Sequence, residues 1–80
     1  MSPAQALRAA RERSGLNITE AAERLGVSRQ SFSRWENGHL APAPDRIQQI
    51  VDGLGMSVEE AKALGDAHPS VRVFVASPAA

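Results

Sequence analysis

Apolar residues recur every three or four positions through most of this chain, the spacing that places them on one face of an α-helix. Glycines close several of these segments. Capping boxes open three of them, because a serine or asparagine is followed three positions later by glutamine or glutamate. The boxes are Ser2-Pro3-Ala4-Gln5, Asn17-Ile18-Thr19-Glu20 and Ser57-Val58-Glu59-Glu60. The pattern predicts five short helices within residues 2–15, 17–26, 28–38, 44–55 and 57–65, and therefore an all-α fold.

The second and third predicted helices are joined by a very short turn. Only Gly26 and Val27 lie between Leu25 and Ser28, so the two helices must meet at a steep angle. Glycine permits the left-handed backbone conformation that such a corner needs. Two short helices around a tight glycine turn form a helix-turn-helix arrangement. Its shared core is predicted to consist of Ala21, Ala22, Leu25, Val27, Phe32 and Trp35.

The C-terminal residues differ from the rest of the chain. Residues 66–70 are typical of a linker, and residues 71–75, VRVFV, alternate with period two and have high β-propensity. The sequence therefore predicts a helical domain over residues 1–65, followed over residues 66–80 by a linker and a strand-like tail that is a candidate for dimerisation.

Length and composition narrow the class of protein. A chain of 80 residues is expected to form one domain with a small core, and without cysteine it has no disulfide. No apolar run is long enough for a membrane span, and no signal peptide follows Met1, so a cytoplasmic protein is expected. Formal net charge is zero, but residues 1–40 carry six arginines against four glutamates, a net of +2. The first half is thus the candidate for meeting a polyanion, although scattered solubilising charges would look the same.

A family resemblance is carried by residues 7–42, LRAARERSGLNITEAAERLGVSRQSFSRWENGHLAP, and continues through residues 47–60, IQQIVDGLGMSVEE. These segments resemble the Cro/phage-repressor type (XRE family) of helix-turn-helix domain. The resemblance implies a five-helix repressor-like fold and binding of double-stranded DNA. Three positions depart from the family pattern, because Ile18 stands where a polar residue usually reaches a DNA phosphate, and Ala21 and Ala61 replace common leucines. The strand-like tail lies outside the usual five-helix unit.

The third predicted helix carries the candidate base-reading residues. Phe32 and Trp35 point inward at helical spacing, so they anchor a helix whose other face is polar. Arginine can donate two hydrogen bonds to guanine, glutamine can bracket adenine, and serine suits either. The resemblance implies that Arg29 and Gln30, together with either Ser33 or Arg34, read base edges. An ordinary solvated helix face is the alternative.

Candidate phosphate contacts flank the same helix. Asn17 and Ser28 are predicted helix caps, and the amides at a helix N-terminus suit phosphate, although capping alone would also explain these two residues. Asn37 and His39 follow the third helix, where the resembling repressors touch the other side of the groove; for His39 an inert loop position is the alternative. The resemblance also implies a partly buried ion pair between Arg11 and Glu36 that positions the third helix, the alternative being two independent surface charges.

Catalysis finds no support, because the sequence contains no nucleophile-base-acid set, glycine-rich phosphate loop or metal-ligand cluster, and no cofactor is expected. The leading hypothesis is a sequence-specific DNA-binding regulator of transcription, most simply a repressor, that reads the major groove of an operator with helix 28–37. The runner-up is an antitoxin or other protein-interaction module that neutralises a toxin-like partner.

A homodimer is also expected, held by the tail and by the fourth and fifth helices. In this hypothesis two tails pair antiparallel and bury Val71, Val73 and Val75 on the helices. A tail that folds back onto its own helices and a disordered tail are the alternatives.

Overall fold

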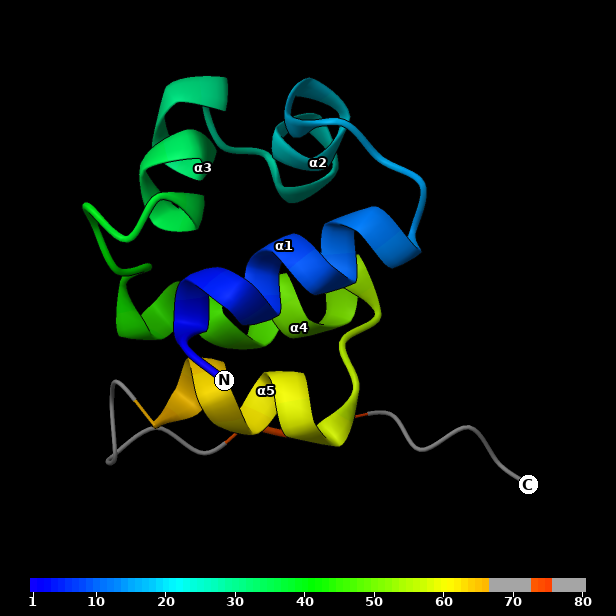
Figure 1. The fold of residues 1–80 in the computed structure, drawn as a ribbon, viewed down its shortest axis with the longest axis vertical. Helices are drawn as coiled ribbons and strands as arrows, with labels where there is room; N and C mark the ends of the chain where they lie inside the picture. Colours follow the sequence, from blue (N-terminus) through cyan, green and yellow to red (C-terminus); the bar gives the residue numbers. More distant parts are fainter. Residues whose placement is uncertain (67–72, 76–80) are drawn as a thin grey trace.

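The computed structural model describes residues 1–66 and 73–75, and the helices within them follow the predicted order (Figure 1). Each capping box is formed, so Ser2, Asn17 and Ser57 each accept a hydrogen bond from the backbone N–H three residues later. The elements are α1 (Pro3–Arg13), α2 (Ile18–Leu25), α3 (Arg29–Glu36), the 3-10 turn η1 (Pro44–Arg46), α4 (Ile47–Leu54) and α5 (Val58–Gly65). The prediction of an all-α, repressor-like fold is confirmed.

One helix start was predicted wrongly. Pro44 and Asp45 belong to the 3-10 turn, and the α-helix begins only at Ile47. Ala43, at the N-cap of this turn, has no side-chain hydroxyl or carboxylate to cap the first amides. The first turn tightens instead, with the Arg46 N–H donating to the carbonyl of Ala43 at 2.9 Å.

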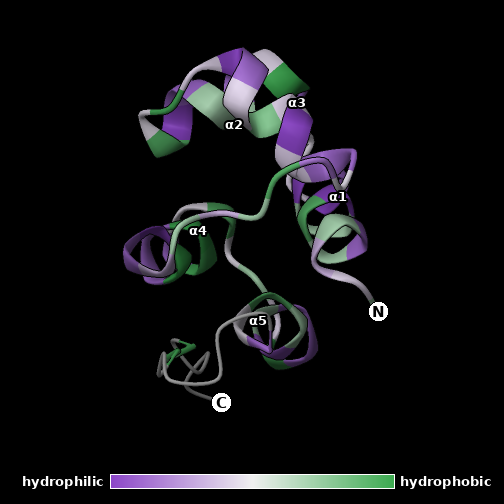
Figure 2. Ribbon diagram, turned by 90° about the vertical axis from the view of Figure 1, so that its left-hand side faces the viewer, coloured by the Kyte–Doolittle hydropathy of each residue, from purple (hydrophilic) through white to green (hydrophobic). Residues whose placement is uncertain are grey.

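The helices form three levels in Figure 1. α2 and α3 lie above α1 and α4, and α5 lies below them, with contacts that join α1 to α3 and α5, and α4 to α2 and α5. The hydrophobic sides of α1, α4 and α5 turn toward one another in Figure 2. The largest fully buried side chains are those of Leu7, Leu25, Phe32, Ile47, Ile50, Leu54 and Leu64. This core is the platform on which the α2–α3 pair stands.

The corner between α2 and α3 has the predicted geometry. Gly26 has φ +68°, which is the left-handed region that favours glycine. The N–H of Val27 donates to the carbonyl of Ala22 at 3.0 Å and closes the end of α2. The shared core of the pair is confirmed, because Ala21, Ala22, Leu25, Phe32 and Trp35 are buried and Val27 is half-buried against them.

The described part of the tail, residues 73–75, is not a β-strand. It keeps the alternation of faces, since Val73 and Val75 pack against the hydrophobic core while Phe74 is 70% exposed. The side-chain amide of Gln48 holds it in place, accepting from the Phe74 N–H at 2.7 Å and donating to the Phe74 carbonyl at 2.6 Å. These residues therefore fold back onto their own helices, which was the alternative to strand pairing. Val71 and Arg72 lie outside the described residues.

Candidate nucleic-acid interface

The outer face of α3 presents polar side chains that no described residue engages. Arg29, Gln30 and Arg34 are exposed, and their side chains form no hydrogen bond or ion pair with residues 1–66 or 73–75. On the inner face Phe32 and Trp35 are buried, with their ring centroids 6.0 Å apart. Two buried aromatic rings thus fix the position of α3, while the side-chain donors on its outer face remain available to a ligand.

Ser33, the fourth candidate base-reading residue, is less free than its neighbours. Its side chain is half-buried, and its hydroxyl accepts a hydrogen bond from the Asn37 Nδ2 at 3.3 Å. Asn37 is the C-cap of α3, and its own N–H donates to the Ser33 carbonyl. The hydrogen bond from Asn37 therefore orients the Ser33 hydroxyl, and the hydroxyl hydrogen remains available to donate to a base.

The candidate phosphate contacts lie at both ends of α3. Ser28 is the N-cap and accepts from the Ser31 N–H at 3.0 Å, and Asn37 and His39 are exposed at the other end. The His39 N–H donates to the Arg34 carbonyl at 3.0 Å, which holds this loop against the helix end.

The N-terminus of α2, which carries Asn17, differs electrostatically from that of α3. The Glu20 carboxylate accepts from the Asn17 N–H at 2.9 Å and so neutralises the positive end of α2. No acidic residue occupies the first turn of α3. The α3 N-terminus is therefore much better suited to a phosphate, while Asn17 keeps only its side-chain NH₂ group to offer.

A buried carboxylate ties α3 to α1. The Glu36 side chain is 2% exposed and accepts from Arg11 at 2.9 Å (Nε) and 2.8 Å (Nη2), and from the more exposed Arg8 at 3.2 Å. Arg11 also donates to the Leu16 carbonyl at 3.0 Å, so its guanidinium links three parts of the chain. Burial alone would raise the pKa of Glu36, but the hydrogen bonds from Arg11 and Arg8 together lower it below its ordinary value.

Three further contacts steady the platform and were not predicted. Arg13, at the end of α1, forms a two-pronged ion pair with Glu60 of α5, at 2.6 and 2.7 Å. The Gln49 Nε2 of α4 donates to the carbonyl of Leu25 at 2.7 Å, where α2 ends. At Gly53 a Cβ atom would lie 2.5 Å from Leu25 Cδ2, so the missing side chain lets α2 sit close on α4. Their residues are far apart in sequence, so no local pattern could have revealed them.

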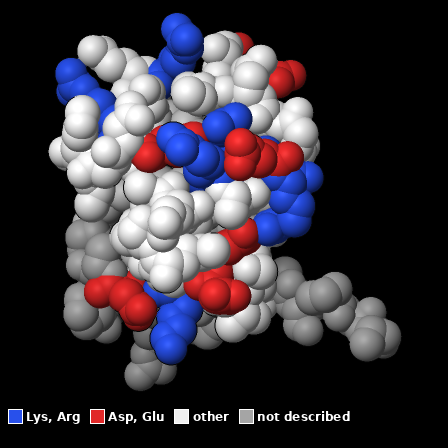
Figure 3. Space-filling view, in the orientation of Figure 1, with Lys and Arg blue, Asp and Glu red and all other residues white. Residues whose placement is uncertain are grey.

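Acidic and basic side chains are distributed unevenly over the surface. In Figure 3 basic side chains stand apart from acidic ones at the top, over α3, while acidic and basic groups are interleaved across the middle of the molecule. Among the described residues, no group of three or more histidine, cysteine, aspartate or glutamate side chains could hold a metal ion. Within the same part of the chain, none of the helices has the length and apolar character needed to cross a membrane.

The geometry defines a helix-turn-helix protein, and comparison with known families agrees. Residues 4–64 match a family described as a helix-turn-helix domain, which is most of the chain, so the chain belongs to this family. A curated relative is the cryptic phage CTXphi transcriptional repressor RstR of Vibrio cholerae serotype O1, 33% identical over 55 residues, or 66% of this chain and 49% of that protein. The chain thus spans about half the length of this relative.

A solved structure shares the fold. It is an HTH_3 family transcriptional regulator from Vibrio cholerae, with a TM-score of 0.63 and 27% identity, and the match covers 82% of this chain and 35% of that one. Both similar proteins are transcription regulators by name, and both are considerably longer than the segment matched here.

Proposed function

We propose that this chain binds double-stranded DNA sequence-specifically and regulates transcription, most simply as a repressor, with α3 in the major groove. The observation that carries the proposal is the α3 face itself. Arginine and glutamine side chains that have no hydrogen-bond or ion-pair partner among the described residues project from a helix that buried Phe32 and Trp35 hold rigidly. Rigid placement matters because a bidentate contact to a base edge tolerates little displacement. The names of the two similar proteins support this function over the protein-neutralising alternative.

In this proposal Arg29 and Gln30 contact bases first, because they occupy the first turn of α3, and Ser33 or Arg34 follows one turn later. Selection of an operator from random DNA, followed by Arg29→Ala, tests the assignment. The variant should lose ~1–3 kcal/mol of discrimination at one operator position and little elsewhere.

Lys62→Ala is the matched control, because it removes one positive charge from an exposed side chain of α5, on the side of the molecule away from α3 (Figure 1). Lys62 lines the groove that we assign below to the dimer, so the comparison uses base preference at each operator position rather than total affinity. The control substitution should leave operator preference unchanged. If Arg29→Ala instead weakens operator and random DNA by the same factor, Arg29 contacts only phosphate and the base-reading assignment is wrong.

Phosphate contacts are assigned to the two ends of α3. Ser28 presents the α3 N-terminus, and Asn37 and His39 extend from the other end, while Asn17 is the weakest candidate because Glu20 neutralises its helix end. His39→Ala should weaken binding to all DNA sequences about equally, since phosphate contacts carry no base information. A loss confined to one operator base pair would contradict this role.

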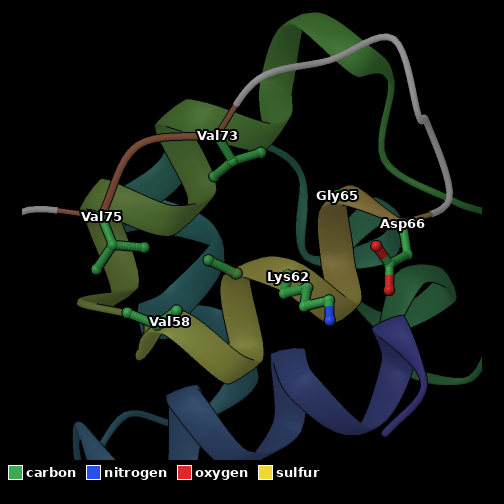
Figure 4. Close-up of a pocket in the computed structure, with 7 residues that line it drawn as sticks. Val58, Lys62, Gly65, Asp66, Val73 and Val75 are labelled. Carbon is green, nitrogen blue, oxygen red and sulfur yellow. The ribbon is translucent and has the colours of Figure 1, made fainter.

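A homodimer completes the proposal, because one helix-turn-helix unit covers few base pairs and half-sites lie ~34 Å apart along DNA. We place the contact at the groove between α5 and residues 73–75, shown in Figure 4. Val58 lines this groove and is 71% exposed, so its apolar surface would gain from burial against a second copy. Phe74 does not line the groove, but it is 70% exposed on the same segment and adds a second apolar surface beside it.

Deleting residues 70–80 tests the part of the tail in this dimer, and Phe74→Ser tests it without removing the valine contacts. Both changes should lower the mass measured in solution and weaken operator binding. A truncated protein that stays dimeric and binds as tightly as the full chain would exclude the tail from the interface.

A further inference from the structure

Ile18 is an apolar residue on the face proposed to meet DNA. It is the first residue of α2, and its half-buried side chain packs partly against the hydrophobic core. The same side chain lines a recess whose other lining residues are Arg29, Gln30, Ser33 and Arg34, all on α3. Four polar side chains of α3 and one apolar side chain at the start of α2 thus surround a single hollow.

The major groove of DNA displays one apolar group, the C5-methyl of thymine, beside the donors and acceptors of the base edges. With α3 in that groove, the recess faces the base edges and Ile18 forms its apolar wall. We propose that Ile18 is a specificity-determining residue that contacts the C5-methyl group of a thymine next to the bases read by Arg29 and Gln30. This inference rests on the proposed function and names part of the operator that the function requires.

A phosphate contact at this position is disfavoured by the chemistry of the site. The isoleucine side chain has no donor, and the Asn17 N–H beside it is already bonded to the Glu20 carboxylate, whose charge repels phosphate. A deoxyribose contact is the remaining apolar alternative, and it would not depend on a base methyl group. Because Ile18 is β-branched and packed on the core, its position is largely fixed before DNA arrives.

The test begins with the operator selected from random DNA, in which each thymine of one half-site is replaced in turn by deoxyuridine. This change removes only the C5-methyl group. For the unmodified protein, one position should weaken binding about fourfold, the factor corresponding to ~0.8 kcal/mol for one buried methyl group.

Ile18→Ala should bind the thymine and deoxyuridine operators equally, because the partner of the methyl group is gone. Leu16→Ala is the matched control, since Leu16 is also half-buried against the core but does not line the recess. It should keep the fourfold sensitivity. Melting curves establish a temperature at which all three proteins are folded, so the comparison does not depend on stability.

Two results would overturn the inference while leaving DNA binding intact. One is a half-site in which no deoxyuridine weakens binding, and the other is an Ile18→Ala variant that keeps the sensitivity of the unmodified protein. Failure to enrich any sequence from random DNA is a different outcome, because it would refute the proposed function and the inference together.

Discussion

Replacing Glu36 with alanine would test whether the ion pairs beneath α3 hold the proposed reading helix in place. The substitution strands Arg11, whose side chain is only 15% exposed and donates two hydrogen bonds to this carboxylate. Removing one partner of a buried pair typically destabilises a protein by ~3–5 kcal/mol. Arg11 keeps its bond to the Leu16 carbonyl and some access to water, so we expect the lower end, about 3 kcal/mol.

Thermal and urea unfolding at neutral pH would measure this loss. For a domain of this size, 3 kcal/mol corresponds to a fall in Tm of roughly 12–24 °C. At a temperature where the variant is folded, its affinity for operator and random DNA should fall by similar factors, because Glu36 orients α3 without touching bases.

Two further variants sharpen the experiment. Arg8→Ala removes the other, 55% exposed partner of Glu36 and should change stability by no more than ~1 kcal/mol. The double change of Arg11 to methionine and Glu36 to leucine should recover much of the loss, because it leaves no charge stranded. A Tm for Glu36→Ala within a few degrees of the parent protein would refute the reasoning and show that water solvates Arg11 adequately.

Two other predictions concern the platform. The pKa values of Glu36 and Glu60 both lie below the ordinary 4.5, so the folded state binds these protons less readily than the unfolded chain. Their stabilisation is therefore complete above about pH 4.5 and is lost as pH falls below it. Urea unfolding between pH 7 and 3 should show a smaller loss for Glu60→Gln, and an equal loss would contradict the assignment. Gly53→Ala should lower the Tm despite the better helix propensity of alanine, because its Cβ would meet Leu25; a raised Tm would show that Leu25 moves aside freely.

Local signals in the sequence were enough to predict the helices and most of their ends, the start of α4 being the exception. A capping box spans four residues and the Gly26 corner spans four, so each is complete within a short stretch of chain. The exposed face of α3 followed from the spacing of Phe32 and Trp35 in the same way. The roles assigned to particular exposed residues came from the family resemblance, since spacing alone does not distinguish a DNA-binding face from a solvated one.

Contacts between distant residues could not be predicted in this way. Arg13 and Glu60 are 47 positions apart, and Glu60 showed only its local capping role in the sequence. Its second role depends on how α1 and α5 pack, because only that packing brings the guanidinium within reach. A capping glutamate uses few of its acceptor sites, so one residue can serve both partners.

The tail shows why a correct pattern led to the wrong element. Alternating valines predict one apolar face, and Val73 and Val75 do share one, but the pattern does not specify what satisfies the backbone between them. A strand would pair Phe74 with another backbone, whereas here Gln48 supplies the same donor and acceptor from a side-chain amide. One glutamine on α4 can thus replace a neighbouring strand at a single residue. Alternation in a short terminal segment therefore predicts which side chains are buried more reliably than it predicts a β-strand.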